Sequence, residues 1–176
     1  GNKVNCIRYL VTRLRNTELS KLEKMASAIG TELRAGRKTV VAAMGHMGMN
    51  FIGRFDDEIW AVNEEVSDGL ESQMKSYEKS AVGALVLRLG YMGLHRDLQA
   101  LFKRKKQRVM LIAAENPREE MAIPAGYDLH VDPGFAFGDA CVSIEGYPIP
   151  ILPPSGVMQL AAYESINVAV QNQRVP

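Results

Sequence analysis

The sequence predicts an α/β fold, a three-layer α/β/α sandwich around a mostly parallel, doubly wound sheet, preceded by N-terminal helices. Three short, apolar and partly β-branched runs carry this prediction, at residues 39–44, 84–89 and 109–114. Such runs are typical of parallel strands that are buried on both faces. Helical segments alternate with them along the chain, which indicates crossover connections and a sheet covered on both sides.

The length and composition are those of an ordinary globular protein. The 176 residues fit one domain, which we divide into N-terminal helices at 1–36 and an α/β core at 37–176. An apolar fraction of 47% and a charged fraction of 23% are unexceptional. A formal net charge of +1 gives no broad field for nucleic acid or a membrane surface, so we expect neither partner.

The cysteine pattern and the apolar runs bear on location. Cys6 and Cys141 lie far apart and form no CxxC motif, which fits a reducing compartment better than a disulfide scaffold. No apolar run reaches the roughly 18 residues that span a bilayer. We therefore expect a cytoplasmic protein. The chain begins at Gly1, and a removed leader stays an open alternative.

The first 36 residues predict two helices. Apolar residues recur at helical spacing over residues 7–14 and again over 19–33. Asn16 and Thr17 interrupt this pattern, and either fits as the cap of the second helix. Gly36 stands where a glycine commonly follows the last residue of a helix.

The middle of the chain adds weaker elements. Residues 59–62 fit either a short strand or part of a helix, and residues 70–79 look helical and polar. Residues 94–106 predict an amphipathic helix with a basic end, which suits the helix dipole. Residues 127–131 alternate in polarity and predict a fourth strand, at an edge of the sheet.

The last forty residues predict a turn and a helix. Residues 141–144 and 147–152 flank a possible turn at Glu145 and Gly146. After Pro153 and Pro154, Ser155 fits as the cap of a last helix that ends near residue 171.

Two glycine-rich turns follow strands and are candidate ligand-binding sites. Ligands of parallel sheets bind beyond the carboxyl ends of the strands, near a topological switch point. Glycine lets backbone amides approach an anion closely, whereas a tight strand-to-helix turn explains the same residues without any ligand. The candidate residues of these turns are Gly45, His46, Met47, Gly48, Gly90, Tyr91, Met92 and Gly93.

Two further positions stand out for binding. Ser155 and Gly156 begin the last helix, where a hydroxyl and free amides together suit a phosphate, although an ordinary cap explains Ser155 equally well. Arg88 lies inside an otherwise apolar strand, and a charge there needs a partner or water. The arginine therefore marks either the pocket end of the strand or an exposed position.

Residues for proton transfer are few. An aldose–ketose isomerase needs a base that moves a proton between adjacent carbons, and His46, His95 and Glu65 are the candidates. Glu64 and Glu164 are further carboxylates of interest, while surface or structural roles explain all of these side chains as well. The three histidines are isolated and no HxxxH spacing occurs, so we predict neither a metal nor a cofactor.

Four segments together resemble the sugar-isomerase (SIS) family of phosphosugar-binding domains. Residues 40–47 resemble its first strand and Gly-His-Ser turn, and residues 85–93 its second strand and Ser-Asn-Ser-Gly turn. Residues 132–140 with 144–146 are similar to a segment of uncharacterised SIS proteins near the phosphoheptose isomerases. Residues 153–157 resemble the Pro-Thr-Ser-Thr-Val start of a helix.

The resemblance implies a SIS-type phosphosugar-binding protein with a sugar phosphate as its small-molecule ligand, and it leaves isomerase activity open. Met47, Gly90, Met92 and Gly156 replace hydroxyl residues of the family, and Ser155 is the clearest survivor. The alternative is a non-catalytic, ligand-sensing or structural dimer that has lost phosphate binding. The family also implies a homodimer or homotetramer, in which the N-terminal helices pack between subunits.

Overall fold

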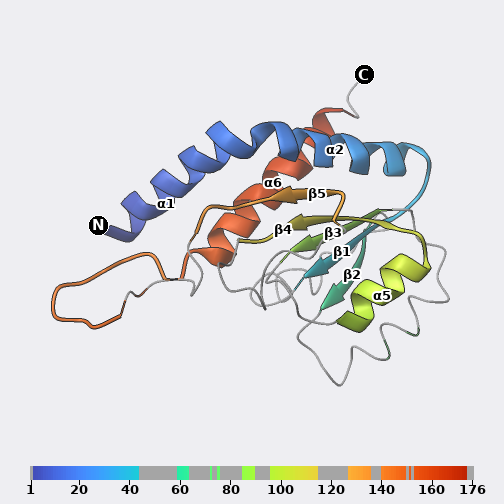
Figure 1. Cartoon of the computed structure of the whole chain (residues 1–176). Helices are drawn as coiled ribbons and strands as arrows, with labels where there is room; N and C mark the ends of the chain where they lie inside the picture. The colour runs from blue at the N-terminus through green and yellow to red at the C-terminus, as the bar shows by residue number, and fades with distance from the viewer. Residues whose placement is uncertain are drawn as a thin grey trace.

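A computed structural model describes residues 2–43, 59–63, 72, 75, 85–89, 96–114, 127–135, 140–149, 151 and 153–173. Its described strands form one sheet with the order β2-β1-β3-β4-β5 (Figure 1), and every neighbouring pair is parallel. The strands are β1 (Thr39–Ala43), β2 (Ile59–Asn63), β3 (Leu85–Leu89), β4 (Arg108–Ile112) and β5 (Leu129–Val131). The three strands predicted from the apolar runs are confirmed, residues 59–63 form a strand, and the fourth predicted strand lies at an edge.

Alternate residues of the central strands face two different sets of helices. On one side, Val41, Leu87 and Ile112 join a core with α2 (Leu19–Arg34) and α6 (Ser155–Asn172). On the other side, Val40, Val86 and Val109 pack against Leu101 and Phe102 of α5 (Arg96–Arg104). Figure 1 shows α5 across the sheet from α2 and α6. The α/β fold is confirmed, while the complete three-layer sandwich stays a prediction.

The N-terminal helices are joined by a π-helical turn. Helix α1 (Asn2–Arg13) continues through the π-turn η1 (Leu14–Glu18) directly into α2. The predicted break is wrong: neither Asn16 nor Thr17 caps the second helix, and the Thr17 hydroxyl instead donates to the Arg13 carbonyl at 2.7 Å. Hydroxyl bonds of this kind bend helices without ending them.

The spacing of buried residues explains the π-turn. Leu10, Leu14, Glu18 and Leu22 are all buried, and each lies four residues after the one before. In an α-helix, residues four apart are offset by about 40° around the helix axis. After three such steps the side chain no longer lies on the face of the first one. The wider i→i+5 turn rotates each residue by less and keeps these side chains on the buried side of the helix.

The end of α2 follows the sequence prediction for Gly36. This residue has a φ of +70°, and its amide donates to the Leu33 carbonyl at 2.9 Å. The Arg37 amide donates to the Glu32 carbonyl at 3.0 Å, which completes a Schellman motif. The Arg37 guanidinium also binds both carboxylate oxygens of Glu32, at 2.9 and 3.1 Å.

Residues 140–149 form an arm that projects from the body of the protein (Figure 1). Val142 and Ile151 make a single antiparallel bridge at its base, and Gly146, with a φ of +84°, lies in the predicted turn. Ile144, Tyr147 and Ile149 are exposed along the arm. Helix α6 then runs to Asn172, close to its predicted end.

Candidate functional site

The carboxyl ends of the strands and the start of α6 lie at the same side of the sheet. In Figure 1 the strand arrows point toward the end of the molecule where α6 begins. Ala113 and Ala114 follow β4 there, and Asp132 to Phe135 follow β5. We call this side the carboxyl edge. Parallel sheets bind their ligands at this edge, because the connecting loops leave crevices between them.

The first turn of α6 presents helix amides at the carboxyl edge. The helix begins at Ser155 and its N-cap position is Pro154, which makes no side-chain cap. The Met158 amide donates to the Pro154 carbonyl at 3.0 Å. The amides before it occupy the positions where a helix start attracts an anion.

The prediction that Ser155 caps α6 is wrong. Ser155 is the first residue inside the helix, and only 7% of its surface is exposed. Two prolines precede it, and Pro154 takes the cap position because proline lacks the amide that a helix start would leave unbonded anyway. The Ser155 side chain is thus buried at the carboxyl edge.

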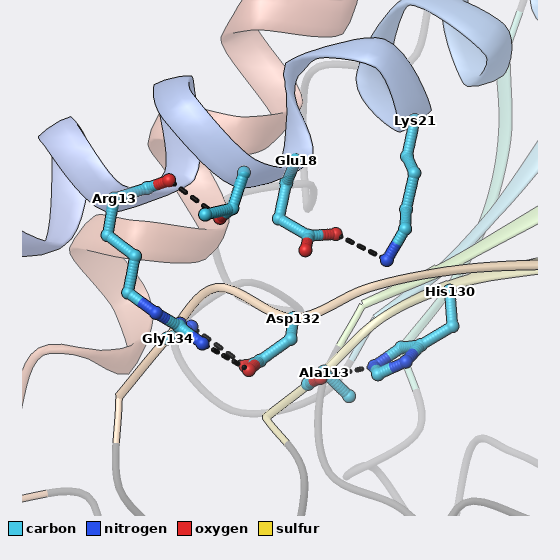
Figure 2. Close-up of polar contacts among 8 residues, drawn as sticks. Arg13, Glu18, Lys21, Ala113, His130, Asp132 and Gly134 are labelled. Carbon is cyan, nitrogen blue, oxygen red and sulfur yellow. Dashed lines mark hydrogen bonds and ion pairs between the residues drawn. The ribbon is translucent and has the colours of Figure 1, made fainter.

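An ion pair joins helix α1 to the segment that follows β5. Arg13 Nη2 of α1 lies 3.1 Å from Asp132 Oδ2, and Asp132 Oδ1 accepts the Gly134 amide at 2.8 Å (Figure 2). The side chains are 36% and 18% exposed, so the pair is partly shielded from water. The carboxylate thereby holds its own turn with one oxygen and the N-terminal helix with the other.

A histidine ties the end of β5 to the end of β4. His130 Nε2 lies 2.7 Å from the Ala113 carbonyl oxygen (Figure 2). A carbonyl oxygen only accepts, so Nε2 carries the proton and donates this hydrogen bond. The bond continues the strand pairing beyond Ile112, where the Ala113 amide also donates to the Val131 carbonyl at 3.2 Å.

Arg88 is buried in the central strand and bonded to a tyrosine. It is 4% exposed, so the alternative of an exposed strand position is wrong. Arg88 Nη1 donates to the Tyr127 hydroxyl at 2.6 Å. Tyr127 packs against Leu111 and Ala113. A buried guanidinium requires such partners because the loss of water around a charge is costly.

Most of the site residues predicted from the sequence lie outside the described residues. These are Gly45, His46, Met47, Gly48, Glu64, Glu65, Gly90, Tyr91, Met92, Gly93 and His95. Ser155 and Gly156 are described and lie at the carboxyl edge. Glu164 lies nine residues along α6 from Ser155, or about 13 Å along the axis, and accepts from Asn167 Nδ2 at 3.4 Å.

Sequence reasoning missed the pairing of Arg13 with Asp132 and the bond of Tyr127 to Arg88. Asp132, Pro133 and Gly134 carry a recognisable turn signal, because aspartate bonds its own backbone two residues on. Arg13 gives no comparable signal, since it stands among other basic residues of an amphipathic helix. Its partner lies 119 residues away in the sequence.

In the described part of the chain, no group of three or more side chains of the metal-binding types comes together. None of the helices found there combines the length and the apolar character that crossing a membrane requires. Neither Cys6 nor Cys141 forms a disulfide.

Comparison with known proteins identifies a fold neighbour. No family model matches the chain, and no curated protein matches it. The E. coli CFT073 protein c3406, solved in complex with arabinose-5-phosphate, is similar with a TM-score of 0.58 and 12% identity. The match covers 98% of this chain and 88% of that chain. RecJ from Thermus thermophilus, solved in complex with Mn2+, is similar with a TM-score of 0.48 and 13% identity. That match covers 89% of this chain and 22% of the RecJ chain.

The likeness to c3406 shows a shared fold, while the likeness to RecJ is too slight to support an argument. This chain therefore shares its fold with a protein whose structure was solved in complex with a phosphosugar. Membership of the SIS family stays a prediction.

Proposed function

We propose that this protein binds a phosphosugar at the carboxyl edge, in the manner of SIS domains. The observation that carries the proposal is the fold shared with c3406, whose structure contains the phosphosugar arabinose-5-phosphate. The start of α6 at the carboxyl edge supports it, since a helix start attracts the charge of a phosphate.

Backbone amides carry much of the phosphate contact in this proposal. Met47, Gly90 and Met92 stand where the family has serines, and neither glycine nor methionine offers a hydroxyl donor. The amides of the turns at 45–48 and 90–93 and of the first turn of α6 remain, together with the Ser155 hydroxyl. The phosphate is then bound mainly by N–H groups, and the sugar by side chains around them.

Thermal unfolding with added ligand tests this proposal. A ligand that binds only the folded protein stabilises it by about 2.7 kcal/mol at one hundred times its Kd. We expect a saturable rise in Tm with arabinose-5-phosphate and a smaller rise with free arabinose at the same concentration. Ser155→Ala should weaken the effect of the sugar phosphate. Ser165→Ala is the matched control, because Ser165 lies on the exposed side of the same helix and donates to Ala161 at 2.7 Å.

Two results count against phosphosugar binding. One is the absence of any shift with arabinose-5-phosphate and related sugar phosphates at millimolar concentration. The other is an equal shift with arabinose and its 5-phosphate, which would mean that the phosphate contributes nothing. Equal weakening by Ser155→Ala and Ser165→Ala would remove Ser155 from the site and leave the rest of the proposal standing.

Isomerase activity is the finer part of the proposal. His46, His95 and Glu65 are the groups for moving a proton from one sugar carbon to its neighbour. Incubation with arabinose-5-phosphate should then yield the corresponding 2-ketose phosphate, and individual replacement of the three residues should identify the base. Stabilisation by the aldose phosphate without any ketose would instead favour the ligand-sensing alternative.

We further propose that the protein forms a homodimer or a homotetramer through α1 and the arm. Val4, Tyr9 and Val11 are 58%, 68% and 40% exposed on α1, and Tyr147 and Ile149 are 62% and 65% exposed on the arm. Helix α1 carries three basic residues, Lys3, Arg8 and Arg13, and no acidic one, whereas residues 140–149 carry Glu145 as their only charge. The two surfaces are therefore both apolar and opposite in charge, so an arm fits α1 of a second copy.

Light scattering after gel filtration tests the assembly. The paired change Tyr147→Ser with Ile149→Ser should shift the protein toward monomer. Val168→Ser is the control, because Val168 is 58% exposed but lies on α6. A wild-type monomer at tens of micromolar would refute self-association, and a dimer unaffected by the paired change would remove the arm from the interface.

A further inference from the structure

The turn after β5 is shaped to receive a guanidinium group. Asp132 Oδ1 accepts the Gly134 amide at 2.8 Å, which leaves Asp132 Oδ2 directed at Arg13 Nη2, 3.1 Å away. Figure 2 shows the Arg13 side chain reaching down from α1 to this turn. The carboxylate supplies the negative charge, and the turn holds that carboxylate in place.

Gly134 makes the close approach possible. Its φ is +82°, a conformation that side-chain-bearing residues rarely adopt. A Cβ at this position would overlap Arg13 Nη1, so the guanidinium occupies the space that any other residue would fill. We call Asp132, Pro133 and Gly134 together the arginine seat. Charge, turn geometry and the missing side chain all favour the same partner.

Arg13 reaches the seat from the junction of the N-terminal helices. It is the last residue of α1, and the π-turn begins at the next position. The Thr17 hydroxyl donates to the Arg13 carbonyl at 2.7 Å, which fixes the backbone at this junction. Helix α1 is therefore joined at its last residue to the segment that leaves the carboxyl end of β5.

The residue that follows the arginine seat in the sequence belongs to the core beneath α6. Phe135 follows Gly134 directly, is 5% exposed and packs in the same core as Met158 and Ala162 of α6. A shift of the seat moves Phe135, and Phe135 belongs to the same buried core as α6, whose first turn lies at the carboxyl edge. Arg13 is thus linked to α6 through the seat and this shared core.

We propose that Arg13 is a positioning residue for the ligand-binding edge. By occupying the seat it fixes residues 132–135 and, through Phe135, the first turn of α6. The N-terminal helix thereby controls the geometry in which the phosphate is bound. The ligand half of this inference rests on the phosphosugar-binding function proposed above, whereas the positioning half concerns the protein alone.

Hydrogen exchange of the ligand-free protein tests the positioning. Arg13→Gln removes the charge, and we expect the hydrogen-bonded amides of Gly134 and Met158 to exchange about two- to fivefold faster. Arg13→Lys keeps the charge, and its amide exchange rates should lie between those of Arg13→Gln and the wild type. Arg15→Gln is the matched control, because Arg15 is exposed on the neighbouring π-turn. Equal exchange in Arg13→Gln and Arg15→Gln would overturn the proposal.

A steric variant gives a second test of the seat. Gly134→Ala places a Cβ against the guanidinium and also strains the turn. In the Arg13→Gln background the shorter side chain removes the collision and leaves only the strain. The two changes should therefore be non-additive, with Gly134→Ala accelerating exchange at residues 132–135 less in that background. Additive effects would show that the guanidinium does not occupy the seat.

A titration with arabinose-5-phosphate tests whether Arg13 also influences ligand binding. Arg13→Gln should raise the concentration for half-maximal thermal stabilisation about two- to fivefold, and Arg15→Gln should leave it unchanged. Faster exchange with unaltered affinity for the sugar phosphate would overturn the link to the ligand. If the wild type does not respond to arabinose-5-phosphate, the proposed function fails, and the exchange experiment still decides whether Arg13 positions the edge.

Discussion

The bond between Arg88 and Tyr127 predicts a measurable loss of stability in Tyr127→Phe. The change deletes one oxygen, which accepts from Arg88 Nη1 at 2.6 Å, and leaves the ring in place. A hydrogen bond to a charged group contributes about 1.5–3 kcal/mol. The upper part of that range applies here, because Arg88 is 4% exposed and the protein replaces its water. For a chain of this size the loss corresponds to a fall in Tm of about 4–12 °C.

Urea unfolding of wild type and variant measures this loss. Tyr9→Phe is the control: Tyr9 is 68% exposed, so its hydroxyl is hydrated in both states and its loss should cost less than about 0.5 kcal/mol. The double variant Arg88→Met with Tyr127→Phe should be less destabilised than the sum of the single variants, because the two changes remove the same hydrogen bond. The reasoning is refuted if Tyr127→Phe costs no more than Tyr9→Phe, or if the two changes add.

Three further predictions concern the fold. Gly36→Ala should cost about 1 kcal/mol in urea unfolding, because a Cβ meets no atom there and only the φ of +70° is strained; Gly36→Asn should cost less. Phe102→Ala should cost about 3–5 kcal/mol by the same assay, since Phe102 is fully buried against the sheet. Glu32 raises the pKa of the Arg37 guanidinium above its usual value by a hydrogen bond and by charge attraction. That stabilisation is fully present below the usual pKa of arginine and is lost only as the pH rises through the raised one, so Arg37→Gln should lower Tm similarly at neutral pH and at about pH 10.

The strands were the most predictable part of the fold. Residues 39–43 and 85–89 are buried without exception, and a strand covered on both faces must be apolar at nearly every position. Residues 59–63 were ambiguous because four apolar residues fit a strand and a helix alike. The π-turn escaped prediction for a related reason. Polar residues at 16 and 17 look like a break, and only the four-residue spacing of the buried side chains distinguishes a wider turn from an interruption.

The candidate site was predictable in its place and less so in its contacts. The rule that ligands bind beyond the carboxyl ends of parallel strands locates the edge without any coordinates. The partner of Arg13 does not follow from such a rule, because residues 119 apart meet only through the packing of α1, α6 and β5. The prediction that Ser155 is the helix cap was likewise wrong, since proline and serine at adjacent positions both suit a helix start. The residues of the two glycine-rich turns stay predictions.

The residues without a hydroxyl at positions 47, 90 and 92 and the arginine seat have a common physical consequence for the proposed phosphosugar site. A serine hydroxyl rotates to meet a phosphate, whereas a backbone amide points where its peptide plane points and cannot adjust by itself. If Met47, Gly90 and Met92 leave the phosphate to amides, affinity depends on how firmly the backbone at the carboxyl edge is held. Arg13 and Asp132 hold one part of that backbone at 3.1 Å. Disturbing the seat should therefore weaken binding of arabinose-5-phosphate in this protein more than it would where hydroxyls share the contact, and restoring a hydroxyl by Met47→Ser should reduce the sensitivity to Arg13→Gln. The ratio of half-maximal ligand concentrations with and without Arg13→Gln, compared in the two backgrounds, measures this dependence. An unchanged ratio would mean that amide positioning does not limit binding.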